Sequence, residues 1–362
     1  MTVVRTAFLS LTVDEAAAEA AALGYADKHA RRLRRTLLAG ADPMTDEAVP
    51  ARLREAFATR FDWLQTTVTA TSPSSDGACK LLLRLADGRT VETVRLPGAG
   101  TPPGLEPGLR PPRAAVASAC ISSQVGCAMA CRFCASGLDK VARNLTAAEL
   151  LEQVVHLRRL GSVERLVFMG SGEPTQNLGA VARLIEVMRD EGGLGPRHII
   201  VSTVGPASAI DRLAALGLKF TLALSLHSAR AEVRASLIPT QTKADPVSLL
   251  DAADRFAAAT GRPYQVELVL LGGINDGPDE EAALAALLRG RRCHLSVIRW
   301  NRVEGMAFDT TPWPRANDLV RSLRAAGVSA TLRRTVGQHA DGACGQLRAR
   351  VEKRLAEHPA DL

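Results

Sequence analysis

Short apolar runs recur from residue 114 onwards, and stretches of helical composition separate them. The runs are RLVFM at 165–169, HIIVST at 198–203, FTLALSL at 220–226, VELVLL at 266–271, HLSVI at 294–298 and ATL at 330–332. The intervening helical stretches are 178–190, 208–215, 247–259 and 279–289. Near-continuous apolar strands that alternate with helices predict a parallel sheet whose faces are covered by helices. Together with a strand before Cys120, they predict an α/β fold, a partial (β/α)6 barrel of about six units.

The segment that precedes these runs has a different pattern. Residues 12–60 contain helical stretches, and extended runs follow over 62–96 with a hairpin signal at the Asp87-Gly88 pair. Residues 98–113 hold nine Gly or Pro residues, which is typical of a linker. The predicted domains are an N-terminal helical plus β-hairpin accessory domain at 1–97, a linker at 98–113 and a core domain at 114–362.

The charge of the chain favours a polyanionic partner. Its formal net charge is +7, and the run K-H-A-R-R-L-R-R at 28–35 gathers basic side chains within one predicted helix. Clustered basic side chains on such a helix would neutralise phosphates and make affinity salt-dependent. A solvated helix face is the alternative interpretation of the same run.

The cysteines and the apolar runs indicate the compartment. Seven cysteines are an odd number, which argues against a secreted disulfide framework and predicts a reducing cytoplasm. No apolar run of eighteen residues occurs, so we expect no membrane helix. The N-terminal residues turn acidic too early for a secretory signal.

Three of these cysteines, Cys127, Cys131 and Cys134, form a C-x3-C-x2-C triplet within C-A-M-A-C-R-F-C. The spacing brings three thiolates onto one tight loop. A closed zinc site or an ordinary four-iron cluster takes four protein ligands, so three ligands predict a cluster with one open iron. The alternatives are three unrelated buried thiols, or a zinc site that a distant His completes.

Polar signatures follow the predicted strands at their carboxyl ends. These are G-S-G-E-P at 170–174, S-T-V-G at 202–205, S-L-H-S at 225–228 and Asn301. In a parallel sheet these ends lie at one edge, where ligands bind. Each signature alone is weak, but together, and next to the cysteine loop, they predict a ligand site.

The chain at this point resembles the radical S-adenosylmethionine (SAM) enzymes, and within them the RlmN/Cfr family of RNA adenine methyltransferases. The resemblance covers about residues 24–350. It is strongest at Q-V-G-C-A-M-A-C-R-F-C-A-S-G (124–137), F-M-G-S-G-E-P (168–174), S-L-H (225–227) and A-C-G-Q-L (343–347). The triplet indicates the superfamily, whereas Cys120 and A-C-G-Q-L indicate the family.

The resemblance implies a role for each matching residue. Cys127, Cys131 and Cys134 would hold a [4Fe–4S] cluster whose open iron binds SAM. The residues that would contact SAM are Gly172, Glu173, Ser202, Ser225, Leu226, His227 and Asn301. Cys344 would carry the transferred methyl group and Cys120 would be its resolving partner. Glu92 would accept a proton.

The resemblance also implies a reaction that consumes two SAM molecules per methyl group. The first SAM methylates Cys344, and the second is cleaved to a radical that activates this methyl group. The methylene radical adds to C2 of an adenine, and a disulfide between Cys120 and Cys344 then releases the product. The implied substrates are rRNA and possible tRNA targets, the electron donor is a flavodoxin-type protein, and a monomer is the default state.

Several motifs depart from the family pattern, which leaves alternatives for the target. G-M-G-E-P-L is G-S-G-E-P-T here, and N-P-x-P-G is N-R-V-E-G at 301–305. A divergent paralogue could therefore methylate C8, or another RNA. A radical SAM enzyme for a peptide or metabolite, and a non-catalytic zinc or nucleic-acid-binding module, are the further alternatives.

Overall fold

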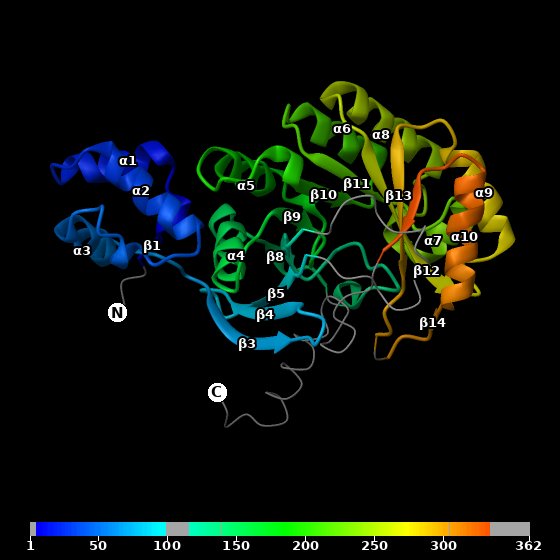
Figure 1. The fold of residues 1–362 in the computed structure, drawn as a ribbon, viewed down its shortest axis with the longest axis horizontal. Coiled ribbons are helices and arrows are strands. Elements are labelled where there is room, and N and C mark those ends of the chain that lie inside the picture. Colours follow the sequence, from blue (N-terminus) through cyan, green and yellow to red (C-terminus); the bar gives the residue numbers. More distant parts are fainter. Residues whose placement is uncertain (1–4, 99–115, 139, 304, 334–362) are drawn as a thin grey trace.

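A computed structural model describes residues 5–98, 116–138, 140–303 and 305–333 (Figure 1). Its centre is an 11-stranded sheet with the strand order β15-β13-β12-β11-β10-β9-β6-β5-β4-β3, and β14 pairs with β12. The parallel strands are β6 (Ser118–Cys120), β9 (Arg165–Phe168), β10 (Ile199–Thr203), β11 (Thr221–Ser225), β12 (Tyr264–Gly272), β13 (Cys293–Arg299) and β15 (Ala330–Leu332). Because β6 and β15 are not neighbours, this parallel part stays open. The predicted α/β fold with a partial barrel is confirmed.

Helices follow the parallel strands along the chain. They are α4 (Ala147–Arg159), α5 (Leu178–Asp190), α6 (Ala207–Ala215), α7 (Ala231–Leu237), α8 (Pro246–Thr260), α9 (Pro278–Leu288) and α10 (Trp313–Ala325). α4 begins with a capping box in which Thr146 Oγ1 accepts from the Glu149 amide at 3.2 Å, while the Glu149 carboxylate accepts from the Thr146 amide at 2.8 Å. The box satisfies N–H groups that the first helical turn leaves without partners.

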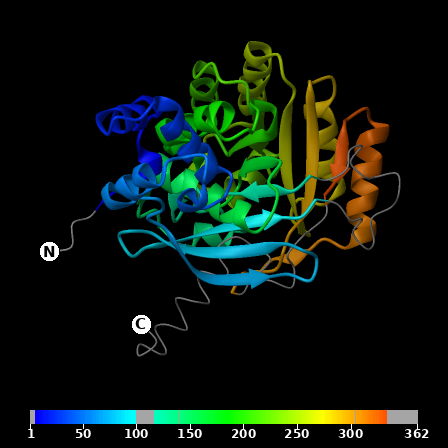
Figure 2. The same ribbon diagram turned by 60° about the vertical axis from the view of Figure 1, so that its left-hand side comes forward.

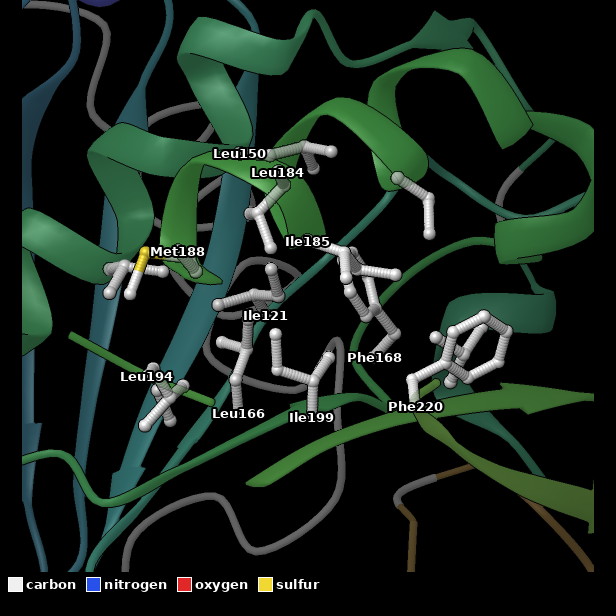
Figure 3. Close-up of a cluster of buried hydrophobic side chains, with 14 of the residues drawn as sticks. Ile121, Leu150, Leu166, Phe168, Leu184, Ile185, Met188, Leu194, Ile199 and Phe220 are labelled. Carbon is white, nitrogen blue, oxygen red and sulfur yellow. The ribbon is translucent and has the colours of Figure 1, made fainter. Parts of the chain in front are cut away.

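Each parallel strand presents two different faces. Leu166 and Phe168 of β9 pack with α4 and α5 in the main apolar core, as Figure 3 shows. Val167 points to the opposite face, where it contacts Ile200 and Ala223. We call the side that packs against the helices the outer face and the opposite side the inner face. Burying each large apolar side chain on the outer face contributes about 1.5–3 kcal/mol, so this face stabilises the fold.

The N-terminal segment combines helices and short strands. Its elements are β1 (Thr6–Ala7), α1 (Val13–Ala22), α2 (Asp27–Leu38), α3 (Ala51–Arg60), β2 (Phe61–Asp62), β3 (Thr67–Pro73), β4 (Cys79–Arg84) and β5 (Thr90–Leu96). β3, β4 and β5 are antiparallel and extend the main sheet, because β5 pairs with β6. Figures 1 and 2 show the three helices beyond α4 and α5, at one end of the molecule.

The N-terminal helices share one apolar core with the parallel sheet. Phe8 and Phe57 pack edge to face with ring centroids 5.6 Å apart, and both belong to the core cluster that contains Leu166. The domain bounds drawn from the sequence stay a prediction. The structure adds that the sheet and the core continue across the two segments.

The remaining elements are short. The strands are β7 (Gln124–Val125), β8 (Arg143–Asn144) and β14 (Asp309–Thr310), and the 3-10 helices are η1 (Phe8–Ser10), η2 (Pro43–Thr45), η4 (Ala135–Gly137), η5 (Pro174–Gln176), η6 (Pro196–His198) and η7 (Pro239–Gln241). Within the described ranges, no helix combines the length and apolar character that crossing a bilayer requires.

Candidate active site

The cysteine triplet lies on the loop between β7 and η4, at the carboxyl edge of the sheet. Two glycines shape this loop. Gly126 has a φ of +78°, and a Cβ there would lie 2.3 Å from the Lys140 carbonyl oxygen. A Cβ at Gly137 would lie 2.7 Å from the Cys131 carbonyl oxygen. The loop therefore folds back tightly on itself, and larger residues at these positions would push it open.

The three cysteine side chains are partly buried and close enough to interact. Burial raises the pKa of the Cys131 thiol, and the nearby Cys134 and Cys127 raise this pKa further. As thiolates beside an apolar cluster, these side chains would need a cationic centre to balance their charge. No three His, Cys, Asp or Glu side chains in the described part of the chain converge as ligands of a single metal ion. In an iron–sulfur cluster each cysteine binds a different iron, so three neighbouring loop thiols could hold one without meeting at a single ion.

An apolar cluster supports this loop from below. Met129 and Phe133 of the loop pack with Leu237, Trp300 and their neighbours. Trp300 Nε1 donates to the Phe133 carbonyl oxygen at 2.8 Å. The Arg132 amide donates to the Leu237 carbonyl oxygen at 3.0 Å. These bonds attach the loop to β13 and α7, so its position is set by the sheet.

Glu173 follows β9 and its carboxylate lies deep in the site, 3% exposed. Its Oε1 accepts from the amide and the hydroxyl of Thr175 at 3.1 and 2.8 Å, and its Oε2 accepts from the Val204 amide at 3.1 Å. Burial nevertheless raises the pKa of Glu173, although these hydrogen bonds oppose the shift. A ligand cation beside Glu173 would compensate its charge.

Gly172 brings Glu173 close to the cysteine loop. Its φ is +105°, and a Cβ there would lie 2.6 Å from the Gln124 amide nitrogen. The Glu173 amide donates to Gln124 Oε1 at 2.9 Å. The charge of Glu173 also raises the pKa of Cys127, after the larger effect of burial. The structure thus places two predicted site residues, Gly172 and Glu173, next to the triplet.

A row of polar side chains crosses the inner face of the sheet. Ser202 and Ser225 lie with their Oγ atoms 2.9 Å apart. Ser225 is paired in register with Glu267, and Glu267 is paired with Ser296. The structure therefore brings the predicted Ser202 and Ser225 together and continues their row across β12 and β13.

Glu267 and Ser296 are candidate site residues that the sequence analysis missed. Both are buried, and Glu267 Oε1 and Ser296 Oγ have no hydrogen-bond partner. Arg333 Nη1 lies 3.4 Å from Glu267 Oε2. The signal was present in the sequence, because a carboxylate interrupts the apolar run VELVLL and a hydroxyl interrupts HLSVI. Polar residues within buried strands need partners, which a ligand can supply.

The S-L-H segment follows β11, and its residues differ in their surroundings. His227 has a φ of 61°, and its ring centroid lies 4.8 Å from that of Phe133 in the cysteine loop. Its Nδ1 accepts from the Val269 amide at 3.2 Å. Burial, with the charge of Arg234, lowers the pKa of His227 to about 3, so the imidazole is neutral. The Leu226 side chain lies in the main core, so only its backbone can face a ligand.

Cys120 and Glu92 lie on the same face of neighbouring strands. Val94 pairs with Cys120, and Glu92 is two residues from Val94, so the three side chains point the same way. Cys120 contacts Val167 and Ile200, which places it on the inner face. Glu92 Oε2 lies 3.3 Å from Lys80 Nζ, and both side chains are 6% exposed. Accessory strand β5 thus brings Glu92 into the interior.

Two further predicted residues sit at the ends of described segments. Asn301 is half-buried and lies just beyond β13, at the edge that carries the cysteine loop. Cys344 lies outside the described residues. Among the described cysteines, none forms a disulfide with another, so the Cys120–Cys344 pair stays a prediction.

Among the Lys and Arg side chains of the basic run at 28–35, one is buried and the others are exposed, so contact of this run with RNA stays a prediction. Arg34 is fully buried, and its Nε and Nη2 donate to the Glu191 carboxylate at 2.5 and 3.1 Å. Arg32 forms an ion pair with Asp46 at 2.8 Å. Helix periodicity explains the burial of Arg34, because this residue falls on the face of α2 that packs against the core. Lys28 and Arg35 are exposed.

Comparisons with known proteins agree with this geometry. Residues 121–286 match the Radical SAM superfamily. A probable dual-specificity RNA methyltransferase RlmN of Rhodopirellula baltica is 44% identical over 88% of this chain and 84% of its own length. A probable dual-specificity RNA methyltransferase RlmN 1 of Opitutus terrae is 39% identical over 96% and 98%. The crystal structure of a radical SAM methyltransferase from Sphaerobacter thermophilus aligns with a TM-score of 0.81, at 34% identity, over 94% of this chain and 98% of that one. The chain therefore belongs to the RlmN-type family of radical SAM RNA methyltransferases.

Proposed function

We propose that this protein methylates a ring carbon of adenine in RNA, with C2 as the default position, and that Cys344 carries the methyl group. rRNA is the proposed substrate, with tRNA as a second one. The observation that carries the proposal is the position of Cys120. Its thiol lies on the inner face of the sheet, on the strand that leads into the cysteine loop. A cysteine outside the triplet is needed there to resolve a bond to a second cysteine.

The residues at the carboxyl edge fit the two cofactors that the family implies. Cys127, Cys131 and Cys134 would hold a [4Fe–4S] cluster, which when bound supplies the electron that cleaves SAM. Glu173 would bind the SAM ammonium, because its buried carboxylate lacks a cationic partner among the described residues. Gly172 keeps the backbone beside it free of a side chain.

The interior residues would hold the rest of SAM. The Ser202 and Ser225 hydroxyls can donate and accept, and Asn301 stands at the same edge. His227 stays neutral, so it adds no charge next to a cationic ligand. Leu226 would contribute its backbone. Cys344, as a thiolate, would accept the methyl group that bound SAM supplies.

Cys120 and Glu92 would complete the reaction. The adduct on the adenine ring would pass its unpaired electron to the cluster and its ring proton to the Glu92 carboxylate. The Cys120 thiolate would then attack the Cys344 sulfur, which forms a disulfide and breaks the bond between that sulfur and the transferred carbon. This carbon would leave as a carbanion and take up a proton to become the methyl group. A flavodoxin-type electron donor, a cytoplasmic location and a monomeric state remain predictions.

The test uses protein purified without oxygen and incubated with SAM, a reductant and total RNA. Mass spectrometry of the digested RNA should reveal 2-methyladenosine. Cys344→Ala should abolish the product, and Cys120→Ala should trap a covalent protein–RNA adduct. A normal turnover by Cys120→Ala would remove the disulfide step. 8-Methyladenosine would replace the C2 assignment, and an iron-free protein would refute the whole proposal.

A further inference from the structure

The two completely buried arginines of the described residues have different surroundings. Arg34 faces the Glu191 carboxylate at 2.5 Å. Arg234, on α7, forms no ion pair with a described carboxylate. Its Nε donates to the Leu226 carbonyl oxygen at 3.1 Å and its Nη2 to the Val204 carbonyl oxygen at 2.5 Å, whereas Nη1 is buried without a hydrogen-bond partner. A buried charge without a counter-charge costs several kcal/mol, so this arginine needs an anion.

Arg234 lies on the helix that contacts the cysteine loop. Leu237, one turn further along α7, accepts the Arg132 amide at 3.0 Å and packs in the same apolar cluster as Cys131 and Cys134. Val204, whose carbonyl oxygen accepts from Arg234 Nη2, belongs to the same cluster, against which Cys127, Cys131 and Cys134 pack. The anion that Arg234 lacks is therefore expected among the cysteines.

We propose that Arg234 provides the counter-charge for an iron–sulfur cluster on Cys127, Cys131 and Cys134, and thereby raises the reduction potential of that cluster. The inference rests on the proposed function, because it takes the triplet as the cluster site. Reduction adds one negative charge to a centre with apolar surroundings. A fixed positive charge nearby stabilises the reduced state more than the oxidised state. Arg234 is a positioning residue, since it acts through the cluster.

The test compares Arg234→Gln with Arg234→Lys in protein that carries its cluster. A redox titration followed by electron paramagnetic resonance gives the fraction of reduced cluster, without RNA. At the wild-type midpoint potential, Arg234→Gln should lower the ratio of reduced to oxidised cluster at least tenfold, which corresponds to about 59 mV for one electron. Arg234→Lys keeps the charge and should stay within about twofold of wild type.

The matched control is Arg34→Gln, which removes a buried arginine that a carboxylate already neutralises. It should destabilise the fold and leave the potential unchanged. If Arg234→Gln does not retain its cluster, citrulline at this position keeps the shape and the donors without the charge, and should shift the ratio equally. An unchanged potential in the neutral variants, or an equal shift in Arg234→Lys, overturns the proposal. The proposed function fails separately, if RNA stays unmethylated while the potential shifts as expected.

Discussion

The outer and inner faces of the sheet carry different kinds of side chains. On the outer face, Leu166, Phe168 and Ile199 join helices in one continuous apolar core (Figure 3). On the inner face of the same strands, the row that starts with Ser202 and Ser225 is polar. Because strand side chains alternate, every second residue can serve the fold while the others serve the chemistry. The comparison teaches that stability and function can be changed separately in this protein.

The inner face also contains polar atoms that the fold leaves without partners. Glu267 Oε1 and Ser296 Oγ are buried and make no hydrogen bond. Each such atom costs about 1–3 kcal/mol. The cluster on the outer face is built from apolar side chains, which need no hydrogen-bond partners. The inner face thus gives up stability that a bound ligand could restore.

The largest expected effect separates the two faces completely. Cys131→Ala removes one of the three thiols at the carboxyl edge. Methylation should fall below detection, because no other group can replace the cluster in starting the radical reaction. The free energy of unfolding of the iron-free protein should change by less than about 1 kcal/mol, since the side chain is only partly buried. Iron content, methyladenosine yield and urea unfolding measure the three quantities. Full activity with two thiols would contradict the cluster assignment.

The second prediction concerns a substitution that should lower stability, with a counterpart that should affect SAM binding. Phe168→Ala on the outer face should lower the free energy of unfolding by about 3–5 kcal/mol, because it opens a cavity in the core. Ser225→Ala is its inner-face counterpart. It should change stability by less than about 1 kcal/mol and weaken SAM binding by about 1 kcal/mol, the value of one hydrogen bond. Urea unfolding and equilibrium dialysis with SAM distinguish the two. Equal losses of stability would show that the faces are not independent.

The third prediction concerns acid. Burial lowers the pKa of His156, near the accessory strands, from 6.5 to about 4, and that of His227, on the inner side, from 6.5 to about 3. The unfolded chain takes up protons below pH 6.5, and the folded protein does not. Stability is therefore complete above this pH and falls as the pH drops towards about 4.

Each histidine should cost about 1.4 kcal/mol per pH unit in that window, or about 2 kcal/mol at pH 5. Buried carboxyl groups with raised pKa values, such as Glu173, act in the opposite direction, so single variants must be compared with wild type. We expect the free energy of unfolding of His156→Gln, measured by urea titration, to fall less between pH 7 and pH 5 than that of the wild type. A variant with the wild-type slope would show that His156 is protonated in the folded protein.

Much of the fold followed from the sequence, because its signals are local. The six apolar runs all became strands, and the triplet and G-S-G-E-P lie at one edge as expected. What the sequence could not show depends on contacts between distant residues. The burial of Arg34 against Glu191 joins elements 157 residues apart. The missing counter-charge of Arg234 is likewise visible only when every neighbour is placed.

The joining of β5 to β6 is a second example. Composition separated the accessory segment from the core at the Gly- and Pro-rich stretch, yet the sheet continues across it through the Val94–Cys120 pair. A strand-forming pattern specifies that a strand exists, but its partner depends on the whole fold. Glu92 therefore reached the inner face beside Cys120 by a pairing that no local pattern encodes. Glu267 and Ser296 were missed for a different reason. A single polar residue in an apolar run does not by itself indicate a ligand site.

The smallest expected effect lies on α2, where Lys28 and Arg35 are exposed and Arg34 is buried. Lys28→Ala combined with Arg35→Ala removes two exposed charges, so RNA affinity should fall a few-fold at low salt, and the difference should shrink as salt is raised. Arg32→Ala is the matched control, because Asp46 already neutralises that charge. Filter binding of total RNA at two salt concentrations measures both. An equal loss with Arg32→Ala would mean that net charge, and not the exposed face of α2, sets RNA affinity.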